Sequence, residues 1–342
     1  MKTLIFLPYF GRWNSYFKLW LHSCSYQKDF DWLILTDIPI AEVLPDNITV
    51  VYCTLQSLKE HFQKKLKMPL SLERPYKLCD YKPFYGYLLS EYLQKYDYWG
   101  YCDCDLIFGD IRKYLTRDLQ KKYDKCIRTG HFSVIRNTPA INTAFLKYNT
   151  YKIVLTSPVI YGHDESIEGY HPGFAGELLN EGYRFFNLEQ PVADIDFRRY
   201  PFYEMDHSGG PYIYFYNKGK LYRIYREKGK IVKRECMYVH LQKRRMSVDE
   251  AVNPECFLIC PNHFTKCPSD IPEENPLLNS DIFWEQISQD KKGYFNRNAE
   301  RFQNLYRDFR RLLHEPEKMD SLLYRFGKDG RKKNEKDINY SK

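Results

Sequence analysis

The sequence predicts an α/β fold: a mostly parallel, Rossmann-like sheet with flanking helices, a smaller β-rich region and a C-terminal helical tail. Short apolar runs that read as buried strands alternate with amphipathic segments over about the first 130 residues. Hydrophobic residues make up 43% of the 342-residue chain, which is enough for a sizeable core. Alternation of this kind favours parallel strands joined by right-handed crossovers.

The first half of the chain supplies the expected sheet and its helices. Thr3–Leu7 reads as a buried strand that Pro8 ends, and the next segment carries its apolar residues at the helical period. Pro45, Asp46 and Asn47 bound the third strand. The elements expected here are strands over 3–7, 32–35 and 48–53, helices over 14–26, 55–67 and 81–96, and a fourth strand that ends before Asp103.

The second half reads as less regular and richer in strands. Asn217-Lys218-Gly219 and Lys228-Gly229 supply turns for hairpins between three polar strands. We expect strands over 126–129, 132–135, 212–216, 221–226, 231–235 and 237–241, and helices over 139–148 and 172–180. Arg301–Leu313 has the period of an amphipathic helix, either docked on the body or in contact with a membrane or partner.

The net charge of +8 is concentrated at the C-terminal end. From Lys291 to Lys342 there are 15 Lys and Arg against 8 Asp and Glu, so the rest of the chain is nearly neutral. A nucleic-acid-binding domain would carry basic residues across its folded surface, so we expect no nucleic-acid partner. A basic tail instead suits an anionic membrane surface, with a solvated tail as the alternative.

The ten cysteines follow neither a disulfide framework nor the usual spacing of a zinc site. Cys256, Cys260 and Cys267 with His263 imitate a metal knuckle, but no close Cys-x-x-Cys pair supports it. Scattered thiols fit a reducing cytosol, so we expect a cytoplasmic protein, with peripheral contact at the inner membrane face through the basic tail. No apolar run of about 18 residues occurs, and Leu4–Leu7 is too short for a signal peptide.

Two carboxylates, Asp103 and Asp105, follow the aromatic and apolar strand Tyr98–Cys102. Carboxylates are costly at the end of a buried strand unless a cation meets them. Ligands of an open α/β sheet lie at the carboxyl ends of its strands, and a divalent metal that carries a nucleotide diphosphate is a natural cation there. Mg²⁺ and Mn²⁺ prefer hard oxygen ligands of this kind. Asp110, directly before Ile111–Leu115, instead fits the cap of a short helix.

His240 ends a late strand and is followed by Lys243, Arg244 and Arg245. An imidazole at this point can complete a metal site that carboxylates begin. The basic residues after it would neutralise a diphosphate leaving group. A purely structural role for a lone histidine is the alternative.

Two further segments are candidates for substrate contact. Asp164 and Glu165 follow a turn and are candidates for the general base that deprotonates an acceptor hydroxyl, with plain surface acids as the alternative. Arg74–Pro83 packs cations and tyrosines upstream of the carboxylate strand. It reads either as a stiff segment that holds a base and diphosphate or as a solvated loop.

Weaker candidates lie on two other segments. Gly130 and His131 are placed on the acceptor side of the site. Asp194 and Asp196 are acids of lower rank.

Together these segments resemble the metal-dependent, nucleotide-sugar glycosyltransferases of the GT-A fold, in particular bacterial enzymes that build capsule and O-antigen polysaccharides. The segments that carry the resemblance are, in chain order, LPYFGRWNSYFKLWLHSC, LTD, RPYKLCDYKPFYGYLL, WGYCDCDLIFGDI with its DxD motif, GHFSVIRN and YVHLQKRRM. The resemblance covers about residues 1–246 and is specific as a set rather than motif by motif.

The resemblance implies Mn²⁺ or Mg²⁺ held by Asp103, Asp105 and His240. The residues that it places at the nucleotide-sugar donor are Pro8, Tyr9, Phe10, Gly11, Asp37, Lys77, Cys104 and Lys243. It also places Asp164 or Glu165 where inverting members keep their base. The transfer it favours is of galactose or galactofuranose from a UDP donor to a hydroxyl of a growing, lipid-linked oligosaccharide or polysaccharide.

Changes of character along the sequence also divide the chain into regions. Residues 1–268 are expected to form a catalytic domain, with about 1–130 as the nucleotide-sugar-binding half and 131–268 as the acceptor-side half. Residues 269–327 would be a helical extension, and residues 328–342 a charged, disordered tail.

Two other classes of function stay open. A metal-dependent nucleotidyl or phosphoryl transferase would use the same paired carboxylates, although the sequence has no G-x-x-x-x-G-K-[ST] loop and no G-x-G-x-x-G motif. A non-catalytic glycan-binding module would use the aromatic residues, which make up 17% of the chain.

Overall fold

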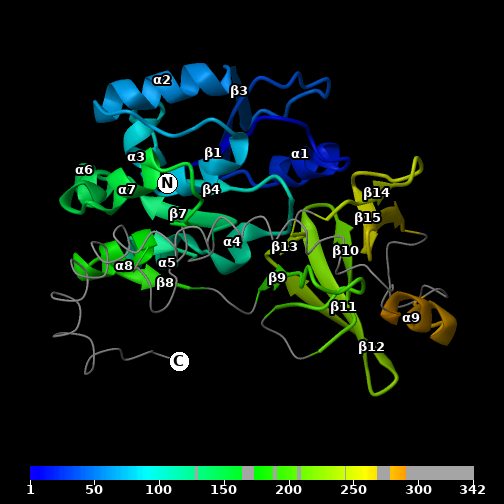
Figure 1. Cartoon of the computed structure of the whole chain (residues 1–342). Coiled ribbons are helices and arrows are strands. Elements are labelled where there is room, and N and C mark those ends of the chain that lie inside the picture. The colour runs from blue at the N-terminus through cyan, green and yellow to red at the C-terminus, as the bar shows by residue number, and fades with distance from the viewer. Residues whose placement is uncertain are drawn as a thin grey trace, which may run out of the picture.

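The computed structural model describes residues 1–127, 130–163, 173–187, 191–205, 209–242, 244–267 and 278–289. These residues form a mixed α/β architecture with three sheets (Figure 1). The N-terminal half surrounds a large, mostly parallel sheet, and the C-terminal half is built on an antiparallel one. The predicted α/β fold is therefore confirmed.

A seven-stranded sheet is the centre of the N-terminal half, in the order β3-β2-β1-β4-β7-β6-β8. Its strands are β1 (Thr3–Pro8), β2 (Phe30–Thr36), β3 (Ile48–Tyr52), β4 (Tyr98–Cys102), β6 (Lys125–Cys126), β7 (Phe132–Arg136) and β8 (Phe185–Phe186). Strands β3, β2, β1 and β4 are parallel, whereas β7 is antiparallel to both of its neighbours. The carboxyl ends of β1, β2 and β4 therefore meet at one edge of the sheet, where α/β folds place their ligands.

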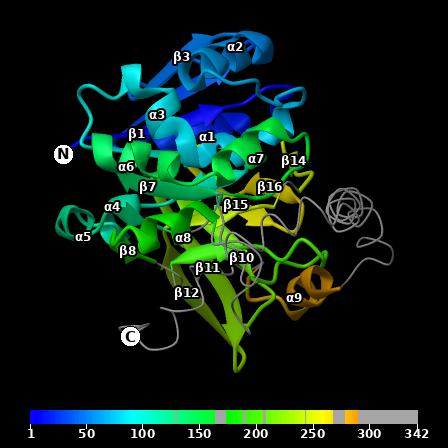
Figure 2. The same ribbon diagram turned by 60° about the vertical axis from the view of Figure 1, so that its left-hand side comes forward.

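Helices cover both faces of this sheet, as a parallel sheet requires (Figures 1 and 2). In β1, Leu4 and Phe6 face one core and Ile5 and Leu7 face the other, which is the period of a strand buried on both sides. The first face carries α2 (Leu55–Leu66), α3 (Tyr85–Leu88), α6 (Pro139–Thr143), α7 (Thr150–Thr156) and α8 (Gly173–Asn180), and the second carries α1 (Phe17–Ser25), α4 (Ile111–Tyr114) and α5 (Arg117–Lys122).

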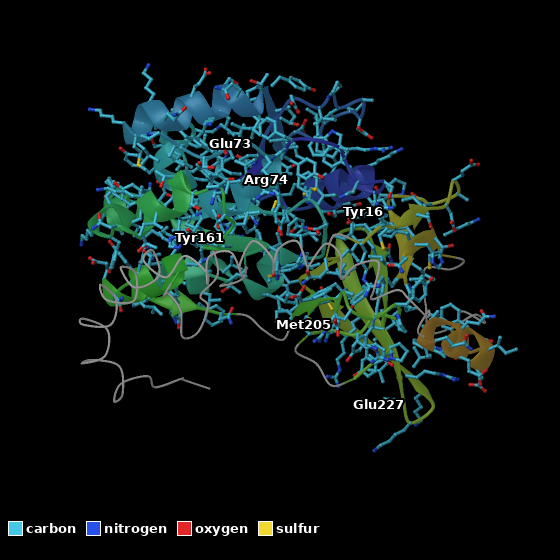
Figure 3. All side chains as sticks on the ribbon, in the orientation of Figure 1. Tyr16, Glu73, Arg74, Tyr161, Met205 and Glu227 are labelled. Atoms are coloured by element: carbon cyan, nitrogen blue, oxygen red, sulfur yellow. The ribbon has the colours of Figure 1, made fainter. Side chains whose placement is uncertain are left out.

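The six-stranded sheet of the C-terminal half has the order β12-β11-β10-β15-β16-β14. Its strands are β10 (Ile213–Asn217), β11 (Lys220–Glu227), β12 (Lys230–Cys236), β14 (Ser247–Val248), β15 (Cys256–Cys260) and β16 (His263–Lys266), and α9 (Asp281–Ser288) packs on one face. Both residues of each predicted two-residue turn have a positive φ, as hairpin turns of this kind require. The β11–β12 hairpin projects from the body with Glu227 near its tip (Figure 3).

A third sheet connects the two halves. It consists of β5 (Leu106–Phe108), β13 (Tyr238–His240) and β9 (Val192–Asp194), in the order β5-β13-β9. Leu106 packs into the core of the large sheet, whereas the next residue, Ile107, packs into the core of the antiparallel sheet. The small sheet therefore lies between the two hydrophobic cores and contributes side chains to both.

Two predicted helices differ from the structure. The region 81–96 holds the end of a 3₁₀ helix, η1 (Pro75–Phe84), then α3 and the short η2 (Ser90–Tyr92) instead of one long helix. Pro83 lacks an amide donor, and the side chains from Tyr81 to Tyr85 are all buried, so packing rather than helical period decides this segment. The helix over 139–148 is likewise split into α6 and η3 (Ala144–Lys147).

Other expectations concern cysteines and membrane contact. None of the ten cysteines, all of which lie in the described ranges, forms a disulfide. Cys260 and His263 are paired residues of the β15–β16 hairpin. Neither residue belongs to the groups of converging metal ligands among the described residues, so the structure gives no support to a metal knuckle here. Within the described ranges no helix has the length and apolar character to cross a bilayer. The predicted helix over 301–313 and the tail lie outside the described residues.

Candidate metal centre

The ends of four strands bring the candidate ligands to one place. Asp103 and Asp105 lie between β4 and β5, directly after the strand that is buried on both faces. His240 is the last residue of β13, opposite Leu106 at the start of β5. On the other side of β13, His240 pairs in parallel register with Asp194, the last residue of β9.

Asp103, Asp105 and His240 form one group whose ligand atoms lie within 4.8 Å of one another. Asp105 and His240 are nearly fully buried, and 3.5 Å separates Oδ1 of Asp105 from Nε2 of His240. Two carboxylates and one imidazole offer mostly hard oxygen donors, which suits Mg²⁺ or Mn²⁺. The residues present therefore fit the divalent metal that the sequence predicts.

His240 is held between two carboxylates. Its Nδ1 bonds to Oδ1 of Asp194 at 2.7 Å, while its Nε2 faces Asp105. Burial by itself would lower the pKa of His240, but these two negative charges outweigh it and raise the pKa to about 10. The hydrogen bond from His240 in turn holds the pKa of Asp194 below its usual value in spite of burial.

A lysine faces the other ligand. Nζ of Lys82 lies 2.8 Å from Oδ1 of Asp103 and donates to the carbonyl of Gly130 at 2.7 Å. The Lys82 side chain is nearly buried and lies over the ring of Tyr101, with 5.7 Å from Nζ to the ring centroid. A cation is thus fixed beside the carboxylates, where it would meet a negatively charged ligand.

Gly130 and His131, predicted on the acceptor side, lie directly beside the metal-ligand group. The carbonyl of His131 accepts the amide hydrogen of Asp103 at 2.9 Å. Its ring stacks on the ring of His240, with centroids 4.2 Å apart. Burial, together with the neighbouring His240, lowers the pKa of His131 to about 3, so its imidazole is neutral at pH 7.

The loop after β1 lies at the same sheet edge. The hydroxyl of Tyr9 donates to the carbonyl of Arg12 at 2.9 Å, and burial with the neighbouring Cys104 and Asp105 raises its pKa. Asn14 donates to the carbonyl of Cys104 at 2.8 Å and so ties the loop to the carboxylate segment. Gly11 has a φ of +114° with open space around it, a conformation that suits glycine.

The other predicted donor residues of this region have varied positions. Phe10 and the Cys104 side chain are buried in the two cores of the large sheet, whereas Pro8 is the last residue of β1. Asp37 is exposed and directly follows β2. Pro8 and Asp37 therefore lie at the edge that carries the metal ligands, as parallel strand ends must.

Lys77, predicted as a donor contact, forms a buried ion pair. Its ammonium group is fully buried, lies 2.6 Å from Asp80 and donates to the carbonyl of Val154 at 2.8 Å. Asp80 also accepts the amide hydrogen of His163 at 3.2 Å. Through these bonds the Lys77–Asp80 ion pair connects η1 to the chain at His163. Lys82, in the same 3₁₀ helix, contacts the carboxylate of Asp103.

Three predicted residues lie outside the described residues: Asp164, Glu165 and Lys243. Conversely, Lys82 and Asp194 belong to the site but were not chosen from the sequence as ligands. Asp194 ends a short apolar run, which is the signal that also singles out Asp103. Tyr16, labelled in Figure 3, is a third. Its hydroxyl is buried without a hydrogen-bond partner among the described residues, and burial with the neighbouring charge of Asp105 raises its pKa.

Some of the solved structures to which the chain is similar are glycosyltransferases. The galactosyltransferase LgtC in complex with donor and acceptor sugar analogues is 10% identical, with 57% of this chain and 76% of that chain covered and a TM-score of 0.31. The glycosyltransferase GlyE of Streptococcus pneumoniae TIGR4 is 14% identical, with 56% and 45% covered and a TM-score of 0.29. Overlaps of this extent do not assign an activity, so the function proposed below rests on the site itself.

No curated protein matches the chain significantly. A family model, described as a family of unknown function (DUF6625), matches residues 5–268. This span covers about three quarters of the chain and includes Asp103, Asp105, Asp194 and His240. The chain therefore belongs to DUF6625, a family of unknown function whose matched region contains the whole candidate metal centre.

Proposed function

We propose that the protein is a metal-dependent glycosyltransferase that moves a sugar from a nucleotide-sugar donor to a hydroxyl acceptor. The observation that carries the proposal is the convergence of Asp103, Asp105 and His240 at the carboxyl edge of a parallel sheet. A site of this kind suits a nucleotide diphosphate for two reasons. Ligands of open α/β sheets bind at the carboxyl ends of the strands, and a divalent ion held by carboxylates takes phosphate oxygens as further ligands. Bound there, Mn²⁺ or Mg²⁺ would supply charge stabilisation for the departing diphosphate.

The chain's own residues have separable roles in this proposal. Lys82 offers a positive charge beside Asp103, where a departing diphosphate would meet it. Asp194 orients the imidazole of His240 through the 2.7 Å hydrogen bond to Nδ1, which directs Nε2 toward the carboxylates. Lys243, next in the chain to these strands, is proposed to neutralise the leaving group, and Asp164 or Glu165 to deprotonate the acceptor.

The donor of the proposal is UDP-linked galactose or galactofuranose. A thermal-shift screen with Mn²⁺ and each of UDP, GDP, CMP and ADP tests the donor base, because a ligand at about 100 times its Kd adds roughly 2.7 kcal/mol of stability. Asp103→Asn should lose the shift. Asp110→Asn is the matched control, since Asp110 only caps α4 and asparagine caps equally well.

The outcomes of this screen separate the three classes of function. A metal-dependent shift with one nucleoside diphosphate, followed by metal-dependent hydrolysis of its sugar conjugate, supports the transferase. Preference for a nucleoside triphosphate would favour the nucleotidyl transferase instead. No shift in any nucleotide would remove the support for the proposal and favour a glycan-binding module.

The acceptor of the proposal is a lipid-linked surface polysaccharide, as in capsule or O-antigen assembly, and the protein would be cytoplasmic with peripheral contact at the inner membrane face. The support is the basic sequence from Lys291 to Lys342. Sedimentation with liposomes that contain anionic lipid tests this for the full chain and a chain ending at Gln289. Loss of low-salt binding on truncation supports the contact, and unchanged binding refutes it.

A further inference from the structure

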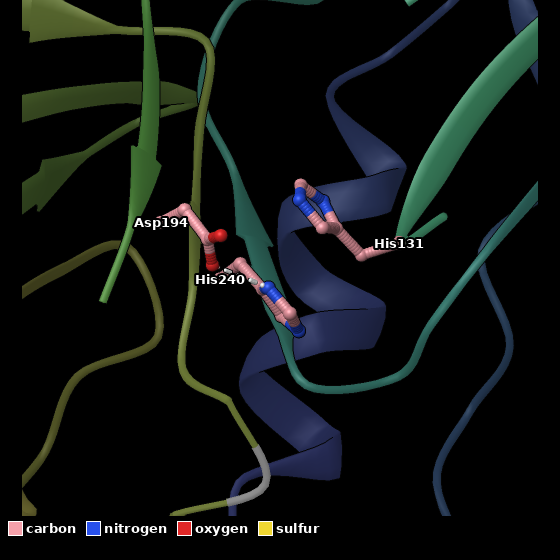
Figure 4. A group of neighbouring side chains, drawn as sticks. All are labelled: His131, Asp194 and His240. Atoms are coloured by element: carbon pink, nitrogen blue, oxygen red, sulfur yellow. Dashed lines mark hydrogen bonds and ion pairs between the residues drawn. The ribbon is translucent and has the colours of Figure 1, made fainter. Parts of the chain in front are cut away.

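His131, Asp194 and His240 form a second group of ligand atoms that all lie within 4.8 Å of one another. Figure 4 shows the three side chains meeting, with the hydrogen bond between Asp194 and His240 dashed. The group differs in chemistry from the first, because it has two imidazoles and one carboxylate. His240 is the one residue that this group has in common with the group of Asp103, Asp105 and His240.

The side chain of His131 has an unused ligand atom. The residue is 5% exposed, and its Nδ1 has no hydrogen-bond partner among the described residues. Leaving a buried polar nitrogen unpaired costs free energy, so structures retain it where a ligand or a function uses it. The backbone of His131 is fixed to that of Asp103, and its ring is fixed by stacking on His240, so this nitrogen is held in position.

The two nitrogens of His240 face different partners. Nε2 faces Asp105 in the oxygen-rich group, and Nδ1 faces Asp194 in the second group. A neutral imidazole offers one lone pair at a time, so His240 can serve one group or the other but not both at once. The structure therefore holds two alternative metal positions that share one ligand.

We propose that His131, Asp194 and His240 bind a borderline ion such as Zn²⁺ at a second position, in competition with Mn²⁺ or Mg²⁺ at the oxygen-rich group. Two imidazoles and a carboxylate are a ligand set typical of Zn²⁺ with an open fourth position. Zn²⁺ takes the place of the proton between Nδ1 of His240 and Asp194, and that proton is released to solvent. Their ligand atoms, now 2.7 Å apart, then separate to about 3.3 Å, the spacing that Zn–N and Zn–O bonds of roughly 2.0–2.2 Å produce in a tetrahedron.

Binding of Zn²⁺ here has a consequence for the first group. It removes the hydrogen bond by which Asp194 orients His240, and it occupies the lone pair that the oxygen-rich group needs. Zn²⁺ is therefore expected to displace Mn²⁺ rather than to bind beside it. This inference concerns metal binding alone and does not rest on the proposed transfer reaction.

The test is titration of the full chain with Zn²⁺ alone and with Mn²⁺ alone, by calorimetry. His131→Phe keeps a flat ring against His240 but has no ligand nitrogen. This variant should bind Zn²⁺ at least tenfold more weakly and Mn²⁺ within twofold of wild type. Asp103→Asn should weaken Mn²⁺ binding at least tenfold and leave Zn²⁺ affinity within twofold of wild type. Any Zn²⁺ bound by cysteines elsewhere contributes equally to both variants and does not affect the comparison.

The proposal is overturned if His131→Phe binds Zn²⁺ as wild type does, or if Asp103→Asn weakens Zn²⁺ as much as His131→Phe. A second measurement on the wild-type chain does not depend on the folding of a variant. Co²⁺ at the second position should show the strong visible absorption of a tetrahedral ion, which Zn²⁺ removes and Mg²⁺ does not. Weak, octahedral absorption would refute the nitrogen-rich position.

Discussion

Replacement of Asp194 is the sharpest test of how the metal centre is built. The carboxylate accepts from Nδ1 of His240 at 2.7 Å and from Gln242 at 2.7 Å, so its Oδ1 fixes the imidazole from the side away from Asp105. Loss of such a partner commonly costs 10–100-fold in metal affinity. Asp194→Asn keeps an acceptor oxygen but removes the charge, so we expect about a tenfold loss of Mn²⁺ affinity, or about 1.4 kcal/mol.

Asp194→Ala also removes the acceptor, so the expected loss rises to about 100-fold, or roughly 2.7 kcal/mol. The measurement is the free Mn²⁺ signal in electron paramagnetic resonance during titration of the full chain. Asp196→Asn is the control, because that carboxylate bonds Arg198 rather than His240. Affinity of Asp194→Ala within twofold of wild type, or an equal loss in Asp196→Asn, would refute the reasoning.

Three further predictions concern ionisable groups that the fold encloses. Asp80→Ala should lower the free energy of unfolding by about 3–5 kcal/mol in urea titrations, because it leaves Lys77 buried without its counter-ion; a loss below 1 kcal/mol would contradict this. Burial raises the pKa of Glu177 to about 8, so wild-type stability should fall as the pH rises from about 4.5 through 8, by at most about 5 kcal/mol, because only the unfolded chain releases this proton. Urea titrations at pH 5 and 8.5 should show no such fall in the free energy of unfolding of Glu177→Gln. An equal fall in wild type and variant would disprove the role of Glu177. Lys82→Met should raise Mn²⁺ affinity severalfold in calorimetry, because it removes a cation 2.8 Å from Asp103 that repels the metal ion. A weaker affinity would show that this repulsion does not govern metal binding.

Local signals in the sequence were sufficient for the elements that short-range chemistry decides. The turn residues Asn217-Lys218-Gly219 and Lys228-Gly229 predicted the hairpins, because glycine readily takes the positive φ that such turns need. Asp110 was predicted as a cap, and its side chain does accept the amide hydrogen of Lys113. The carboxylates after β4 stood out because charge at the end of a buried strand is costly.

Other features depend on contacts between distant parts of the chain. Asp194 and His240 are 46 residues apart, and only the parallel register of β9 and β13 makes them neighbours. The sequence could not distinguish Lys77 from Lys82, since both lie in η1 and are buried. Contacts with distant residues separate them, with the carbonyl of Val154 for the first and with Asp103 for the second. The helix expected over 81–96 failed because its first part, Tyr81–Tyr85, is buried at every position and contains Pro83.

The small sheet has a consequence for folding cooperativity. Its strands send alternate residues into the core of the large sheet and into the core of the antiparallel sheet, as Tyr238 and Val239 do. The metal ligands lie at the end of this sheet, so an ion bound there is fastened to both halves at once. Ligand binding should therefore not only raise the midpoint of unfolding but also narrow the transition, as two halves that could open separately become one cooperative unit.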